Sequence, residues 1–503
     1  MSQFELSRLF SDHAVLCRDQ EIRVFGKADP LTPITAALYD GADRLLARDQ
    51  VLAEADGSFL LFLPPQPPQT GCVLKVSGAN ETVVCRDIAI GDVYLANGQS
   101  NMELELQNAD EGRELLKTHA NPNVRYYNVP KCPREGDEAN AANRDARWRA
   151  ISPGVGADMS AAAYFFAMKL QPEIGVPVGI IDCYWGGTSI TCWLDEETLN
   201  ETAEGQRYIR DYEEKSAGKT LEAYLQEEAA FHAETSAWDA AAAQLKEKQP
   251  DITPQELSEH LGPYPWHPPV GCGSPFRPFG LHRTMLRRVV PYTLTGVLFY
   301  QGEEDTWRTS RYDILLFSYL RLLRKLFRND TLPFLNVQLP MWIDKGAADS
   351  KLWPPLRMAQ QRVYLNARNT GLAVMLDQGE YNNIHPTNKR VVGERLYLEA
   401  REVVYHRPTE RAVFATGKYR RGDALVVALT DEIQDQGGGE WLLEIAGADG
   451  NYLPAEARIE DRKLILSNPA VPRPVMARYA WTDYAKVRLF GKNGLPLAPF
   501  VFE

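Results

Sequence analysis

Four segments of the sequence each follow an apolar run, and together they contain the residue types that acyl transfer requires. A serine can act as nucleophile, a histidine as its general base, and backbone or amide N–H groups as donors to the oxyanion. In chain order the segments are GQSNM with Ser100, WGGT with Gly186 and Gly187, YQGEED with Gln301 and Glu303, and NNIHPTNK with His385.

Each segment alone has a common structural explanation. A serine after a strand is usually a helix N-cap, and a glycine pair is usually a turn. Gln301 and Glu303 are also a polar pair that solvates a strand end, and a lone histidine is more often structural than catalytic. The segment around Ser100 lacks the G-x-S-x-G pattern of α/β-hydrolases. Only the combination of all four segments favours acyl transfer.

The runs before these segments predict a parallel β-sheet. Near-continuous apolar strands suit a sheet that is buried on both faces, and helical patterns at 160–174 and 312–327 separate several of the runs. Functional groups in such sheets lie beyond the carboxyl ends of the strands. The candidate strands are residues 92–97, 124–129, 178–185, 294–301, 333–339 and 371–377.

The rest of the chain divides into three further regions. Residues 1–88 contain short alternating runs separated by DGS and a proline-rich stretch, which predicts a β-sandwich. Residues 406–503 return to short alternating strands and predict a second β-rich domain. A catalytic α/β domain therefore spans 89–405. Within it, a segment at about 195–275 is rich in Ala, Glu and Lys and predicts one or two exposed amphipathic helices.

The composition of the chain argues against several classes of binding partner. Its 503 residues carry a net charge of −12, which disfavours nucleic acid and anionic membranes, although one local arginine can still bind one carboxylate. The eight histidines form no HExxH pattern, so no metal site is expected. Seven cysteines without a CxxC pair, and an N-terminus without an apolar signal segment, favour a cytoplasmic location.

The quoted segments also resemble the sialate O-acetylesterase family, a branch of the SGNH hydrolases. GDVYLANGQSNM, YWGGT, YQGEED and IHPTNK are similar to its characteristic blocks, and the flanks at 9–28 and 478–500 are similar to its opening and closing segments. The resemblance implies a flavodoxin-like α/β/α catalytic domain and no cofactor. It also implies that Ser100 is the nucleophile and His385 the base, with an oxyanion hole formed by the Ser100 N–H, Gly186 or Gly187, and Gln301.

The sequence departs from the family pattern at two positions. Asn383 stands where the family has an aspartate two residues before the histidine, and Glu304 stands where it has serine or asparagine. Asn383 has no negative charge, so we expect a Ser–His dyad in which an asparagine or backbone carbonyl accepts from the ring. Carboxylates that are near in the sequence, and so alternative partners for the ring, are Glu303, Asp377 and Glu380.

The family acts on O-acetylated sialic acid, and related members act on acetylated xylan, xyloglucan and mannan. The resemblance therefore implies an acetylated sugar substrate, with O-acetylated sialic acid first and plant oligosaccharides as the alternative. We expect Asn101, Trp185 and Trp307 to contact it, Trp307 by stacking on a sugar ring. A carbohydrate-binding protein with an inactive site is the competing hypothesis, because Asn383 replaces the acid.

Overall fold

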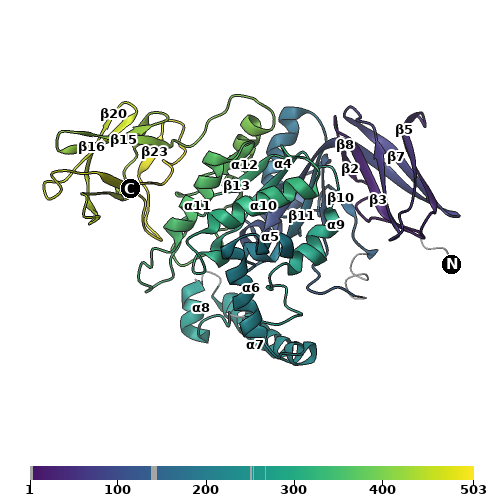
Figure 1. Cartoon of the computed structure of the whole chain (residues 1–503), viewed down its shortest axis with the longest axis horizontal. Coiled ribbons are helices and arrows are strands. Elements are labelled where there is room, and N and C mark those ends of the chain that lie inside the picture. Colours follow the sequence, from purple (N-terminus) through teal and green to yellow (C-terminus); the bar gives the residue numbers. More distant parts are fainter. Residues whose placement is uncertain (1–3, 137–143, 250–251, 253, 267) are drawn as a thin grey trace.

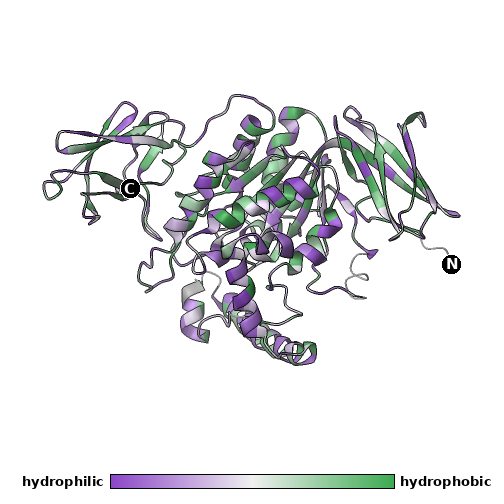
Figure 2. Ribbon diagram, viewed as in Figure 1, coloured by the Kyte–Doolittle hydropathy of each residue, from purple (hydrophilic) through white to green (hydrophobic). Residues whose placement is uncertain are grey.

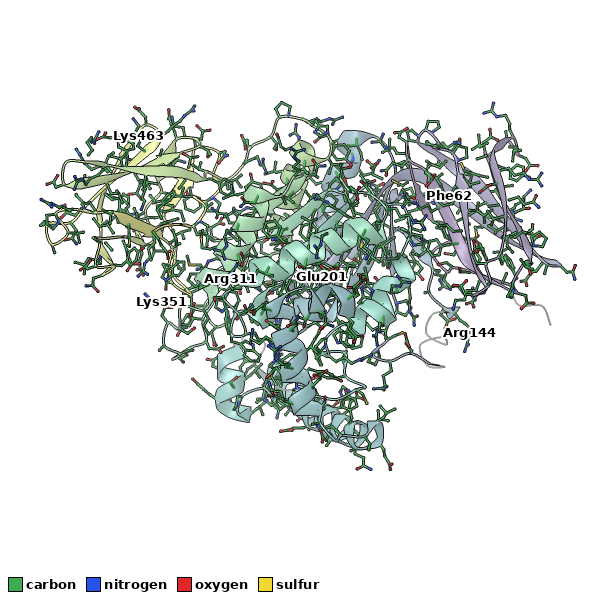
Figure 3. The ribbon with its side chains drawn as sticks, viewed as in Figure 1. Phe62, Arg144, Glu201, Arg311, Lys351 and Lys463 are labelled. Carbon is green, nitrogen blue, oxygen red and sulfur yellow. The ribbon has the colours of Figure 1, made fainter. Side chains whose placement is uncertain are left out.

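The computed structural model describes residues 4–136, 144–249, 252, 254–266 and 268–503. Figure 1 shows a central region of helices around a sheet, with one β-rich region on each side of it and a group of helices projecting below. Side chains fill the space between the ribbons of these regions (Figure 3). One continuous apolar core joins the N-terminal and central regions. This mixture confirms the predicted α/β class.

The central sheet has the strand order β10-β9-β11-β8-β12-β13-β14, and every neighbouring pair is parallel except β9 and β10. From β11 to β14 this is the 2-1-3-4-5 order of flavodoxin-like sheets, with β8 as the first strand. All six predicted strands are present. The bounds are β8 Glu81–Gly98, β9 Asn121–Asn128, β10 Trp148–Ile151, β11 Val178–Tyr184, β12 Gly296–Tyr300, β13 Phe334–Val337 and β14 Thr370–Ala373.

Four long helices cover the sheet in two packed pairs: α4 against α12 and α10 against α11. At Gly393 on α12 a side chain would come within 2.7 Å of Ala162 and Phe165 on α4, so glycine permits this close approach. The bounds are α4 Ala161–Ile174, α10 Tyr312–Leu326, α11 Trp353–Asn366 and α12 Lys389–Val403; shorter helices are α1 Ser100–Glu103, α2 Gly112–Thr118 and α9 Arg287–Val289.

The N-terminal region is built from strands, as predicted. Its last strand, β8, is 18 residues long and continues into the central sheet, so the predicted boundary at residue 88 lies inside a shared strand. The two regions are therefore joined without a linker. The other strands are β1 Phe4–Leu6, β2 Val15–Cys17, β3 Ile22–Ala28, β4 Pro33–Tyr39, β5 Leu45–Leu52, β6 Ser58–Leu63 and β7 Gln69–Gly78.

The segment at 195–275 forms more helices than the expected one or two. Its described residues contain α5 Glu196–Asn200, α6 Ala203–Ser216, α7 Leu221–Lys248 and α8 Pro254–Leu261. Gly218, with a positive φ, follows the end of α6, and Thr220 is the N-cap of α7. These two residues divide a segment whose composition shows one continuous helical pattern. Hydrophilic residues dominate the exposed helices of this group, whereas the central strands are mostly hydrophobic (Figure 2).

The C-terminal region is built around a second apolar core, with residues such as Ile445, Leu464 and Tyr479, which extends to Leu372 and Val374 at the edge of the central sheet. Within the described ranges, no helix is both long and apolar enough to cross a membrane. The strands of this region are β15 Ala415–Arg421, β16 Ala424–Leu429, β17 Ile433–Asp435, β18 Leu443–Ala446, β19 Leu453–Pro454, β20 Glu456–Glu460, β21 Lys463–Ser467, β22 Met476–Tyr479, β23 Leu489–Gly491 and β24 Phe500–Phe502.

Candidate active site

The four polar segments meet at the carboxyl edge of the central sheet. Ser100 follows β8, Gly186 follows β11 and Gln301 follows β12, while His385 lies in the loop between β14 and α12. Since β11 and β12 flank β8 on opposite sides, this edge is the point where the strand order changes direction. Open α/β sheets bind their ligands at such a point.

Ser100 and His385 are in hydrogen-bonding contact, with 2.8 Å between Ser100 Oγ and His385 Nε2. Ser100 is the first residue of α1, reached by a sharp turn at Gly98, where φ is +144°. A side chain at Gly98 would lie 2.0 Å from the carbonyl oxygen of Tyr300. The turn therefore requires glycine, and it presents the serine hydroxyl to the imidazole.

No carboxylate of the described residues contacts the His385 ring. Asn383 Oδ1 accepts from the backbone N–H of His385 at 3.0 Å, and Asn382 Oδ1 accepts from the backbone of Lys345. The three acids considered as partners are engaged elsewhere: Glu303 with Asn101, Asp377 with Arg395 and Glu380 with Asn383. The geometry is that of a dyad, in which Asn383 holds the backbone of the base and not its ring.

This environment keeps the imidazole neutral. Although part of the side chain is exposed, burial of the ring and then the positive charge of Lys389 lower the pKa of His385 to about 4. A neutral imidazole is the form that can accept the serine proton. The base is therefore available over the whole neutral range and well into mildly acidic pH.

Two backbone N–H groups are free to bind an oxyanion. Those of Ser100 and Gly187 have no acceptor in the part of the chain that the structure describes. The N–H of Gly186 differs, because it donates to Glu103 Oε2 at 2.6 Å. Of the predicted glycine pair, only Gly187 has a donor available. Glu103, which accepts from Gly186, is a site residue that no pattern in the sequence predicts.

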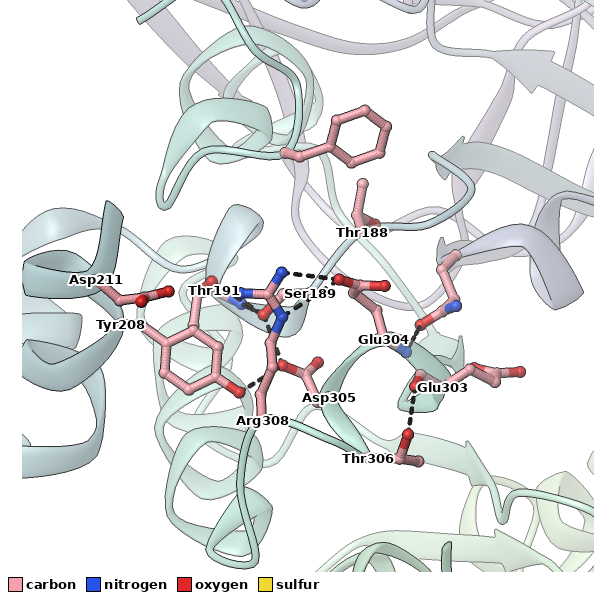
Figure 4. Close-up of polar contacts among 12 residues, drawn as sticks. Thr188, Ser189, Thr191, Tyr208, Asp211, Glu303, Glu304, Asp305, Thr306 and Arg308 are labelled. Atoms are coloured by element: carbon pink, nitrogen blue, oxygen red, sulfur yellow. Dashed lines mark hydrogen bonds and ion pairs between the residues drawn. The ribbon is translucent and has the colours of Figure 1, made fainter. Parts of the chain in front are cut away.

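The prediction that the Gln301 amide donates to the oxyanion is wrong in this geometry. Gln301 is fully buried, and its Nε2 points at Asp305 Oδ2, Thr188 O and Gln99 Oε1, at 2.7 to 3.1 Å. Asp305 in turn accepts from the hydroxyls of Ser189 and Tyr208 (Figure 4). It also accepts from the backbone N–H of Ile190. Gln301, which follows β12, thus hydrogen-bonds Gln99 after β8 and Thr188 after β11, and it stabilises the ends of these three strands.

Gln301→Ala is therefore expected to lower stability more than catalysis. It leaves the buried Asp305 carboxylate without one donor and Gln99 without another, which costs roughly 1–3 kcal/mol in unfolding free energy. Denaturant melts measure this loss, and kcat at a temperature where the variant is folded should fall by less than about tenfold. A loss of 10²-fold or more in kcat with unchanged stability would restore Gln301 as an oxyanion donor.

Asn101 does not contact substrate as expected, since it is 1% exposed and its amide is fully bonded within the protein. Trp185 is half-buried, with the ammonium of Lys131 5.5 Å from the centre of its ring.

Trp307 is 53% exposed and lines a cavity that reaches Gly187. Ser100 and His385 do not line this cavity, but the neighbouring Gly186 lies against Ser100, since a Cβ added there would be 3.3 Å from Ser100 Cβ.

That cavity has a volume of about 260 Å³ and lies between the helical insertion and the sheet edge. It begins at Gly187, where an added Cβ would be 2.2 Å from the ring of Trp266, so this insertion residue lies against the proposed oxyanion donor. Its other walls include Tyr208, Arg277, Glu304 and Trp307. Trp266 and Arg277 stand in no recognisable pattern, and sequence reasoning missed both.

The cavity lining carries one unmatched positive charge. Lys215 pairs with Asp211 at 2.9 Å and Arg308 with Glu304 at 2.8 Å, which leaves Arg277 with no carboxylate partner among the described residues. Arg277 donates to the carbonyls of Pro133 and Ser274. Burial lowers the pKa of Arg277 and raises that of Glu304 to about 7.

Comparisons with known proteins find esterases among the relatives of this chain. No protein-family profile matches the chain. Sialate O-acetylesterase from Mus musculus is 25% identical over 95% of this chain and 90% of its own length, and the Homo sapiens protein of that name is 24% identical over 95% and 88%. The solved structure of a carbohydrate acetylesterase from Xanthomonas citri is 28% identical, covers 100% of both chains and has a TM-score of 0.76.

The fold, the site and these comparisons identify the chain as an esterase. The resemblance to the sialate O-acetylesterase family is confirmed over about 95% of its length.

Proposed function

We propose that the chain is a serine esterase that removes O-acetyl groups from carbohydrate, with Ser100 as nucleophile and His385 as general base. The single observation that carries this is the 2.8 Å contact between the two side chains at the switch point of the sheet. The names of the relatives and of the solved structure support carbohydrate deacetylation. The flavodoxin-like strand order supports an SGNH-type catalytic unit between the two β-rich regions.

The reaction proceeds in two acyl transfers. His385 Nε2 accepts the Ser100 hydroxyl proton as Oγ attacks the acetyl carbonyl, and the N–H groups of Ser100 and Gly187 bind the resulting oxyanion. Collapse of the intermediate breaks the ester bond, and the imidazolium gives its proton to the departing sugar oxygen. Water then attacks the acetyl-serine with the same base, which releases acetate and restores Ser100.

Among acetylated sugars we propose O-acetylated sialic acid as the preferred substrate. Sialic acid carries one carboxylate, and the cavity that reaches Gly187 offers one unmatched cation, Arg277. The exposed rings of Trp266 and Trp307 supply faces on which a sugar can stack. Neutral oligosaccharides from xylan, xyloglucan or mannan have no group that needs Arg277, and they are the alternative that the following experiment tests.

Arg277→Gln is expected to lower kcat/KM for O-acetylated sialic acid by roughly ten- to a hundredfold, because it removes a charge-assisted hydrogen bond. Activity on acetylated xylo-oligosaccharides and on p-nitrophenyl acetate should change little. Acetate release from each substrate is the measurement. The matched control is Arg283→Gln, on the same segment but paired with Glu196 outside the cavity. Equal losses on acidic and neutral sugars would reject Arg277 as a carboxylate-binding residue.

A further inference from the structure

Three polar side chains form a buried chain beneath the dyad. Asn101 Nδ2 donates to Glu303 Oε1 at 2.6 Å, and Lys389 Nζ donates to Asn101 Oδ1 at 2.6 Å. Lys389 is 1% exposed and Glu303 is 5% exposed, and Glu303 Oε2 has no hydrogen-bond partner among the described residues. Burying two ionisable groups is costly, so an arrangement with no direct ion pair calls for a function.

The two charged groups fix the orientation of the asparagine between them. Its NH₂ group cannot donate to an ammonium and its oxygen cannot accept from a carboxylate, so the amide can sit only one way round. Its second hydrogen then bonds the carbonyl of Ile384 at 2.9 Å. Asn101 follows Ser100 and Ile384 precedes His385, so this one amide links the nucleophile to the loop of its base.

Lys389 also contributes charge. It begins α12, four residues after His385. Burial lowers the pKa of Lys389 to about 7, so Lys389 is charged at the acidic pH where the imidazole titrates, and its positive charge then acts on the ring. The other charged groups around the dyad are Glu303 after β12, Glu380 in the loop before His385, and the Glu103–Lys131 pair at Gly186. Lys131 is neutralised by its pairing with Glu103, so Lys389 is the cation whose charge opposes protonation of the ring.

We propose that Lys389 is a positioning residue for the dyad: through Asn101 it holds Ser100 and the His385 loop together, and its charge acts on the His385 ring. The protein has no aspartate to orient the ring, and this buried chain orients the backbone on both sides of it instead. The inference rests on the proposed esterase function, because it concerns the same serine and histidine.

The test is the pH profile of kcat/KM on p-nitrophenyl acetate, whose acid limb reports the essential base of the free enzyme. In the wild-type protein the pKa of about 4 predicts full activity down to about pH 5. Lys389→Met removes a positive charge that disfavours imidazolium, so the limb should move up by roughly one pKa unit. The plateau kcat should also fall while KM changes little, because positioning is lost and substrate contacts are not.

Two further variants make the result decisive. Lys389→Met/Glu303→Gln removes both buried charges, so it leaves no unpaired buried carboxylate that could make the single variant misfold. The acid limb of its pH profile should also move to higher pH. If the acid limb of this double variant returned to the wild-type pH, the shift seen in Lys389→Met would come from the uncompensated negative charge of Glu303. That outcome would contradict the proposal. Lys169→Met, far from the dyad in sequence, should leave the profile unchanged. A wild-type limb in both Lys389 variants would reduce Lys389 to a structural role, whereas an inactive wild-type protein would reject the esterase function itself.

Discussion

Ser100→Ala is expected to lower kcat for acetyl-ester hydrolysis by roughly 10⁴–10⁶-fold, the size of loss that follows removal of a serine nucleophile. Without Oγ no acetyl-enzyme forms, and only the oxyanion donors and binding remain to act on a water molecule. The hydroxyl contacts only His385 among the described side chains, so the melting temperature should change little. Turnover of p-nitrophenyl acetate and a thermal melt measure both quantities.

Ser310→Ala is the matched control, since Ser310 is an exposed serine in the loop that follows Trp307. It should retain wild-type turnover. Normal turnover in Ser100→Ala would contradict the esterase mechanism and leave the chain as a carbohydrate-binding protein or a hydrolase with another nucleophile.

His385→Ala should cause a loss of similar size, because the serine hydroxyl then has no base to take its proton. By contrast, Asn383→Ala should cost about tenfold or less, well below the roughly 10⁴-fold loss when a true triad aspartate is altered. The reason is geometric: Asn383 accepts from the backbone N–H of His385 and does not touch the ring. Kinetics of both variants at pH 7 make the comparison.

If Asn383→Ala lost activity as severely as His385→Ala, the dyad would be wrong and the asparagine would be an essential third member. Asn383→Asp sharpens the distinction. A negative charge near the ring favours imidazolium, so the acid limb of its pH profile should rise while turnover at neutral pH stays similar or increases.

The sequence predicts the sheet and the dyad well, because both depend on patterns along the chain. Apolar runs identify all six strands, and parallel strands bring their carboxyl ends to one edge, so Ser100 and His385 meet although 285 residues separate them. The sequence also shows that the acid of the family pattern is missing at Asn383. The structure adds that no other described carboxylate takes its place.

The direction of a side chain at the end of a strand is harder to predict. Gln301 and Asn101 lie in the right segments, but both point into the protein, toward Asp305 and toward Glu303. Their orientation depends on buried partners from other strand ends, which no local pattern reveals. Lys389 could have been found, since it lies within the same IHPTNK segment as His385, four residues after it.

The cavity that we propose for the sugar is the least predictable feature. Trp266 comes from the insertion and Arg277 follows directly after it, and the composition of the insertion indicates exposed helices and nothing of what they cover. Their meeting with Gly187 and Trp307 depends on how the insertion packs on the sheet edge. Substrate preference is consequently a property of the tertiary structure, whereas the reaction type is visible in the sequence.

The most direct test of the central claim is covalent labelling of the nucleophile. The protein is treated with a fluorophosphonate, digested, and the modified peptide is located by mass spectrometry. The account predicts one adduct on the peptide containing Ser100, no adduct in Ser100→Ala, and labelling slowed by orders of magnitude in His385→Ala. An adduct on another serine, or undiminished labelling of Ser100→Ala, would contradict the assignment of Ser100 as the nucleophile.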